Sequence, residues 1–90
     1  MEDRVKQIKL YDMYGKLLTE KKKEIFELYY HEDLSMAEIA EKQKITAQAV
    51  QDHLKKTSES LEDYEEKLGF LKKNEKIKKL LEEISKELEL

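Results

Sequence analysis

The sequence predicts an all-α fold: a five-helix domain that ends in a long C-terminal helical hairpin. Charged residues make up 43% of the 90 residues, and enrichment in Glu, Lys and Leu is typical of helices. Two glycines and no proline are too few for the turns of an all-β protein. Apolar residues recur at spacings of three and four, which is the helical period. A chain of this length forms one domain, so residues 1–90 are expected to be a single helical unit.

The first two helices are expected to pack together, with the second at the centre of the bundle. Val5, Ile8 and Tyr11 share one stripe of a helix over about 3–14. Gly15 follows, where a residue in the left-handed conformation would end this helix. Thr19 can cap a second helix over about 20–31. Apolar residues lie on more than one face of that second helix, which indicates a central position.

Two N-terminal caps predict a helix-turn-helix over about 35–57. Ser35 and Glu38 have the spacing of a capping box, in which each side chain bonds the other residue's backbone amide. Thr46 can cap the next helix in the same way. Between the caps we expect a short helix over about 36–42 and a tight turn at Gln43 and Lys44.

Beyond residue 57 the second motif helix is expected to continue into a C-terminal helical extension, about 58–90. Apolar positions spaced 4, 3, 4, 3, 4 form an a/d seam: Val50, Leu54, Thr57, Leu61, Tyr64 and Leu68. Gly69 should end this helix, Phe70 and Leu71 should form a turn, and a last helix should cover about 72–88. The two long helices either fold back as an antiparallel hairpin or pair their seams between two chains, as a homodimer.

The charge is uneven along this extension. The whole chain has a net charge of −3, whereas a protein that binds nucleic acid on its own is usually basic. Residues 59–69 hold five acids against one lysine, residues 70–81 hold five lysines against one acid, and residues 82–90 hold four acids against one lysine. Such runs are most often solvated helix faces, but a lysine run also suits phosphate contacts.

No combination of residues predicts catalysis, a cofactor or a metal site, so a non-enzymatic role is expected. Cysteine is absent, which excludes a Cys nucleophile and a Cys-based zinc finger. His31, Glu32 and Asp33 are consecutive, and neighbouring helix residues point about 100° apart, so they do not converge on one ion. No apolar run approaches the roughly 18 residues of a membrane span, and a cytoplasmic location is the expectation.

Five runs of the chain resemble the YlxM family, and the likeness covers about residues 10–70. The runs are YGKLLTEK at 14–21, ELYY at 27–30, LSMAEIAE at 34–41, QAVQD at 48–52 and LEDYEEKL at 61–68. The family consists of small bacterial helix-turn-helix proteins similar to region four of sigma factors. They are typically encoded beside signal recognition particle genes. The resemblance implies a regulatory or accessory role in that pathway, with DNA or signal recognition particle RNA as ligand and particle components as further partners.

The resemblance also implies that residues 36–42 are the support helix and residues 47–57 the recognition helix. The outward candidates are Thr46, Ala47, Gln48, Gln51, Asp52, Lys55 and Lys56. Ala47 stands where the family usually has Arg, so a bidentate contact to guanine or phosphate is lost. The predicted nucleic-acid-binding residues are Thr46, Gln48, Gln51, His53, Lys55, Lys56, Lys72, Lys73 and Lys76.

A second function class remains open: a protein-protein interaction module or dimeric adaptor that keeps the helix-turn-helix only as a scaffold. The acidic run over 59–69 and Ala47 favour this alternative, whereas the lysine run and the capped motif favour nucleic acid. The two classes differ in whether Lys55, Lys56 and the lysines of residues 72–79 share one face of the folded chain.

Overall fold

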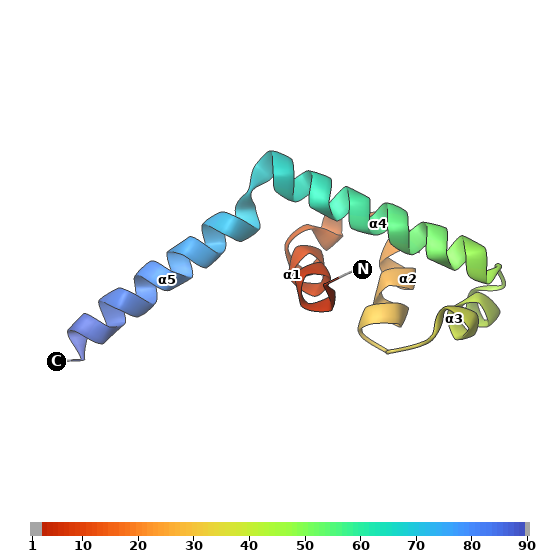
Figure 1. Ribbon diagram of the computed structural model, residues 1–90, viewed down its shortest axis with the longest axis horizontal. Helices are drawn as coiled ribbons and strands as arrows, with labels where there is room; N and C mark the ends of the chain where they lie inside the picture. The colour runs from red at the N-terminus through yellow and green to blue at the C-terminus, as the bar shows by residue number, and fades with distance from the viewer. Residues whose placement is uncertain (1–2, 90) are drawn as a thin grey trace.

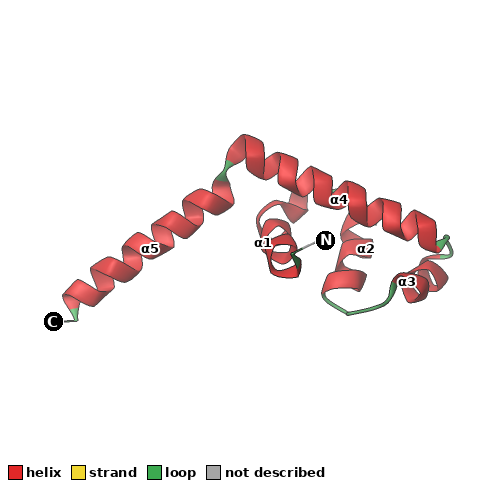
Figure 2. Ribbon diagram, viewed as in Figure 1, coloured by secondary structure: helices red, strands yellow, loops and turns green. Residues whose placement is uncertain are grey.

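The computed structural model describes residues 3–89, and within them it contains helices and no strand (Figures 1 and 2). The elements are α1 (Arg4–Tyr14), the short 3₁₀ helix η1 (Gly15–Leu17), α2 (Glu20–Tyr30), α3 (Met36–Gln43), α4 (Ala47–Leu68) and α5 (Phe70–Leu88). The predicted all-α class with five α-helices is therefore confirmed. No helix among the described residues is both long enough and apolar enough to cross a lipid bilayer.

Side-chain caps start the first four α-helices. Asp3 accepts a hydrogen bond from the Lys6 amide, and Thr19 and Thr46 cap α2 and α4 in the same manner. At α3 the capping box is complete: the Glu38 amide donates to Ser35 Oγ at 3.1 Å, and the Ser35 amide donates to Glu38 Oε1 at 2.9 Å. Each cap satisfies an amide that has no partner inside the helix, so the caps fix the residue at which each of these four helices begins.

The long helix α4 lies across α1, α2 and α3, and the hydrophobic core is between them (Figure 1). Four positions of the predicted seam, Val50, Leu54, Thr57 and Leu61, are buried within this chain. The apolar core consists of Leu10, Tyr14, Leu18, Ile25, Phe26, Leu28, Tyr30, Ile39, Ala40, Val50, Leu54 and Leu61. The first part of the seam therefore packs inside one chain rather than between two.

Gly15 does not adopt the left-handed conformation that we expected. Its φ of −54° and ψ of −32° are right-handed, and the chain continues directly into η1. The reason for a glycine here is space, because a Cβ at Gly15 would lie 3.1 Å from the ring of Tyr11. That ring stacks on Phe26 with centroids 4.2 Å apart, so it has little room to move.

The predicted helical hairpin at the C-terminus is not formed. Residues Phe70 and Leu71 are the first turn of α5 rather than a separate turn, and α5 diverges from α4 instead of folding back on it (Figure 1). Gly69, with φ 65°, ends α4 and also precedes the first residue of α5. A single left-handed residue redirects the chain but is too short a connection for two helices to run side by side.

A hydrogen-bonded cluster holds α5 in this direction. Tyr14 Oη donates to Glu65 Oε1 at 2.5 Å and accepts from the Phe70 amide at 3.1 Å. The Glu65 carboxylate also accepts from the amides of Leu71 and Lys72, at 3.0 and 3.2 Å. We call these groups the Tyr14–Glu65 network. Glu65 thus caps α5 from the preceding helix, and α1 fixes the junction.

The charge state of Glu65 follows from these contacts. Burial alone would raise the pKa of Glu65, but hydrogen bonds from Tyr14 and from two α5 amides outweigh it and lower the pKa below its ordinary value. Burial, together with the hydrogen bond to Glu65, raises the pKa of the Tyr14 hydroxyl. The network therefore consists of a carboxylate and a neutral phenol near neutral pH.

Candidate nucleic-acid interface

The pair α3 and α4 has the geometry of a helix-turn-helix. Ile39 and Ala40 of α3 are buried, as are Val50 and Leu54 on α4, and the two helices pack against each other. Lys44 makes the turn between them, with φ 59° in the left-handed region that normally favours glycine or asparagine. The tight turn predicted at Gln43 and Lys44 is confirmed at Lys44, whereas Gln43 is still the last residue of α3.

The N-terminal part of α4 presents a polar surface to solvent. Thr46, Gln48 and Gln51 are exposed, and His53 is half-buried. The Thr46 hydroxyl accepts the Ala49 amide at 3.0 Å, so its oxygen already has a structural role as the cap of α4. These residues occupy the place that a recognition helix offers to a groove of a duplex.

Asp52 lies on the same surface and makes it less favourable for an anionic ligand. Gln48 Nε2 donates to Asp52 Oδ1 at 3.4 Å, one helical turn along α4. A base edge would have to replace this contact to use the Gln48 amide. The Asp52 carboxylate also repels phosphate, and Ala47 at the start of α4 supplies no compensating positive charge.

Lys55 and Lys56 lie further along α4 and are exposed. Neither forms an ion pair with another residue in the described part of the chain, so both ammonium groups are available to an anionic ligand. The acids Glu59, Glu62 and Asp63 follow within two turns. The basic segment of α4 is therefore short.

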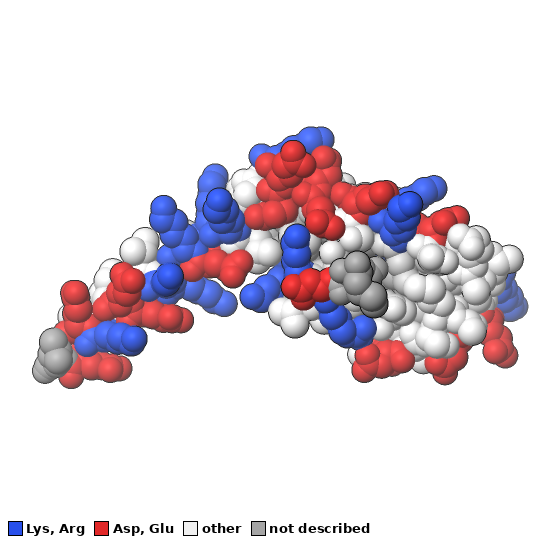
Figure 3. Space-filling model, in the orientation of Figure 1, with Lys and Arg blue, Asp and Glu red and all other residues white. Residues whose placement is uncertain are grey.

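The α5 lysines do not join Lys55 and Lys56 in one basic face. Lys72, Lys73 and Lys76 are exposed on α5, beyond Gly69. Figure 3 shows acidic side chains over the end of α4, between the basic groups of α5 and those near the middle of α4. Lys73 also has a local role, because its Nζ lies 6.0 Å from the centroid of the Phe70 ring. The predicted lysines thus form two separate basic groups, one on α4 and one on α5.

Hollows adjoin both basic groups. One of about 310 Å³ lies between α3 and α4 and is lined by Met36, Gln51, Leu54, Lys55, Ser58 and Glu59. Met36 and Ser58 were not among the predicted site residues. The sequence gives a signal for Met36 alone, which lies in the first turn of the support helix, three residues before the buried Ile39. No pattern in the sequence indicates Ser58.

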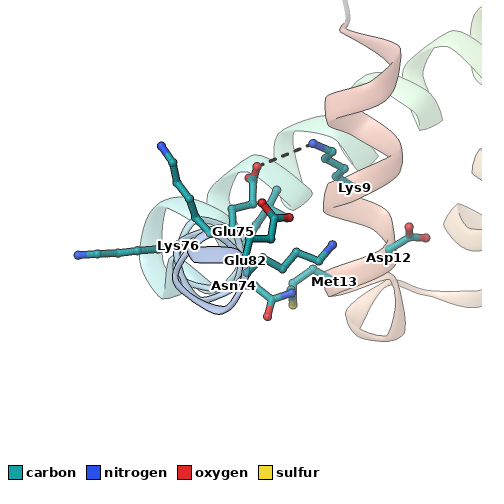
Figure 4. A pocket seen from close by; sticks show the side chains of 10 residues that line it. Lys9, Asp12, Met13, Asn74, Glu75, Lys76 and Glu82 are labelled. Atoms are coloured by element: carbon teal, nitrogen blue, oxygen red, sulfur yellow. Dashed lines mark ion pairs between the residues drawn. The ribbon is translucent and has the colours of Figure 1, made fainter. Parts of the chain in front are cut away.

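The larger hollow, of about 920 Å³, is an open groove between α1 and α5 (Figure 4). Lys9 of α1 reaches Glu75 of α5, with 3.8 Å between Nζ and Oε2. Met13 of α1 and Asn74 of α5 also line this groove (Figure 4). Both charge signs line it, so it does not select a polyanion. Among residues 3–89, no three His, Cys, Asp or Glu side chains are grouped so as to hold a metal ion.

Comparison with known proteins gives one consistent result. The family model UPF0122, "Putative helix-turn-helix protein, YlxM / p13 like", matches residues 1–90. A UPF0122 protein of Caldanaerobacter subterraneus is 53% identical over 75 residues, 83% of this chain and 64% of that protein. A UPF0122 protein of Thermoanaerobacter pseudethanolicus is 49% identical over 81 residues, 90% of this chain and 69% of that protein. A UPF0122 protein of Listeria welshimeri is 48% identical over 79 residues, 88% of this chain and 72% of that protein. The aligned stretch therefore spans just under two thirds of the Caldanaerobacter protein.

Proposed function

Because the chain belongs to the UPF0122 family of YlxM/p13-like helix-turn-helix proteins, we propose that it is a non-enzymatic nucleic-acid-binding accessory protein. The observation that carries this proposal is the pair α3 and α4, packed as a helix-turn-helix with a polar, exposed start of α4. Within the proposal, the protein acts in the cytoplasm as a regulator in the signal recognition particle pathway. That assignment rests on the YlxM resemblance.

In the proposed mechanism the residues have two roles. Gln48 and Gln51 face base edges, where a glutamine amide can donate and accept together. Lys55 and Lys56 take phosphates and orient α4 on the ligand. Thr46 contributes through its position at the N-terminus of α4, where the helix dipole favours an anion. The α5 lysines Lys72, Lys73 and Lys76 form a second phosphate-binding group, and half-buried His53 supports the surface.

The charge distribution makes the expected affinity modest. With a net charge of −3, and with Asp52 and Ala47 on the binding surface, we expect dissociation constants of about a micromolar at physiological salt. The available counterion release is small because few lysines act together. Binding should therefore be measured at about 50 mM salt as well as at physiological salt.

The test is a salt series of binding to duplex DNA and to signal recognition particle RNA. The variant Lys55→Glu/Lys56→Glu should weaken binding to all sequences and reduce the slope of log K against log salt by about one to two units. Lys16→Glu/Lys86→Glu is the matched control, because it makes the same change in net charge at exposed positions away from the proposed surface. Gln48→Ala should relax preference at one base and leave the slope unchanged.

Asp52→Asn sharpens this test. It removes the negative charge from the proposed surface and keeps a side chain that Gln48 can bond, so binding should become several-fold tighter. If the wild-type chain retains neither nucleic acid at about 50 mM salt, the proposal fails. The protein-interaction alternative would then be the first choice. It is favoured by an observation of its own, namely the exposed apolar residues of α5.

A further inference from the structure

Helix α5 exposes an apolar stripe along its whole length. Every third or fourth residue from 70 to 88 falls on one seam, which we call the α5 seam: Phe70, Asn74, Ile77, Leu81, Ile84 and Leu88. The spacings are 4, 3, 4, 3, 4, as in a coiled-coil helix. The exposed fractions are 54% for Ile77, 59% for Leu81, 53% for Ile84 and 81% for Leu88, and no residue of α5 is buried.

The chain itself cannot cover this seam while the Tyr14–Glu65 network is in place. Tyr14 and Glu65 bond the first three amides of α5 and hold the helix away from α4. The contacts of α5 with α1 lie in its first two turns, where Phe70 stacks on Tyr14 and Glu75 pairs with Lys9. They leave the rest of the seam, Ile77, Leu81, Ile84 and Leu88, uncovered. An α-helix of 19 residues rises by about 28 Å, so the seam is long enough for a partner helix to pack along about five turns.

The charges of α5 indicate which partner fits. Its first half holds five lysines and one acid over 72–79, and its second half holds four acids and one lysine over 82–89. A second α5 that runs in the opposite direction places the basic half of each helix beside the acidic half of the other. We propose that the α5 seam is a dimer interface, in which two copies of this chain pair their α5 helices in antiparallel fashion.

The seam has a register that matches this arrangement. With residue 79 at the twofold axis, Ile77 faces Leu81 of the second copy, and Phe70 faces Leu88 of the second copy. The flanking position that repeats every seven residues then brings Lys73 beside Glu87 of the second copy, with Leu80 meeting its own counterpart at the centre. In this register Asn74 faces Ile84 of the second copy, and Lys78 on the other flank meets its own counterpart. The two apolar pairings and the two Lys73–Glu87 contacts per dimer outweigh that single like-charge contact.

A parallel pairing of two α5 helices would bring like charges together. It would give Asn74 its own counterpart as a hydrogen-bonding partner, which favours parallel helices. It would also place both basic halves side by side, with Lys73 against Lys78 of the second copy, and both acidic halves likewise. One amide pair near the start of α5 does not offset the repulsion between the two basic halves and between the two acidic halves, so the antiparallel arrangement is the better fit.

Sedimentation equilibrium from about 10 µM to 1 mM protein tests the association, a range suited to a short helix pair. We expect a concentration-dependent dimer, and Leu81→Glu should abolish it. Because Leu81 is exposed in the single chain, this variant should keep the melting temperature of the packed body formed by α1 to α4, which holds all five tyrosines. A wild-type chain that stays monomeric at about 1 mM would overturn the proposal.

Charge exchange tests the orientation. Lys73→Glu and Glu87→Lys should each weaken the dimer by about threefold to tenfold, since each creates two like-charge contacts per dimer. The double variant Lys73→Glu/Glu87→Lys should restore it. Double-variant affinity no better than either single variant would contradict the antiparallel register.

Disulfide trapping gives an independent answer, because the natural chain has no cysteine. A mixture of Lys73→Cys and Glu87→Cys chains should cross-link between the two kinds of chain. Asn74→Cys alone should not form a homodimer disulfide, and efficient formation of one would show the parallel arrangement instead. These outcomes are independent of nucleic-acid binding, which the Lys55→Glu/Lys56→Glu variant reports separately.

Discussion

Replacement of Leu61 by alanine should destabilise the packed body formed by α1 to α4 more than the same change at the exposed Leu68 of α4. Leu61 is fully buried, where α4 crosses the other helices of the body. Truncation of a buried leucine costs about 2–5 kcal/mol, as lost burial plus a residual cavity. A loss of about 3 kcal/mol lowers the melting temperature of a domain of this size by roughly 12–24 °C. That is a large fraction of a total stability on the order of 5–13 kcal/mol.

Leu68→Ala is the matched control, because it changes the same residue type on the same helix. Leu68 is 39% exposed, so we expect a loss below about 1 kcal/mol. Tyrosine fluorescence during urea unfolding is the suitable measurement, because all five tyrosines lie outside α5. Equal losses in the two variants would show that the packing of α4 described here is wrong.

Four further predictions concern caps, turns, pH and metals. Ser35→Ala should lower the free energy of unfolding by about 1 kcal/mol in urea, because the capping box is lost. Lys44→Gly should raise it by about 1 kcal/mol, since the left-handed conformation strains lysine, whereas Lys42→Gly inside α3 should lower it by a similar amount. The pKa of Glu65 is lowered from 4.5, so its stabilisation is present above that pH and is lost as pH falls through the lowered pKa. Acid melts of Glu65→Gln should accordingly lose less stability than the wild type below about pH 4.5. Treatment with EDTA should leave the melting temperature unchanged, because the sequence offers no convergent ligand set.

Each of these has a result that would count against it. No change in Ser35→Ala would mean that the cap contributes nothing in solution. A destabilised Lys44→Gly would place the turn outside the left-handed region. Identical acid melts for Glu65→Gln and the wild type would remove the network from the acid response, and a melting temperature lowered by EDTA and restored by zinc would reveal a metal site.

Local chemistry made most of the helix starts predictable. The caps at Thr19, Ser35 and Thr46 act within three residues, so the amino-acid order alone indicates them. The burial of Leu61 followed from the a/d spacing. Gly15 shows the limit of the same approach, because its reason is the ring of Tyr11 packed against it and not its own backbone conformation.

The direction of α5 was beyond prediction because it depends on distant partners. Tyr14 and Glu65 are 51 residues apart in the chain, and neither forms a motif that indicates the other. The candidate site shows the same division. The helical period predicts that Gln48 and Lys55 are exposed. The separation of the two lysine groups depends on the direction that α5 takes after Gly69, which the period does not indicate.

The Tyr14–Glu65 network holds only the first turn of α5, and no side chain of this helix is buried. The rest of α5 therefore lies outside the cooperative unit that unfolds as a whole. In a single chain its amides should exchange hydrogen for deuterium through local fraying, at rates set by helix–coil equilibrium and insensitive to changes such as Leu61→Ala. Far-ultraviolet circular dichroism, to which the 19 residues of α5 contribute, should then lose signal before tyrosine fluorescence does. A single two-state fit to the helical signal would misreport the stability of the body.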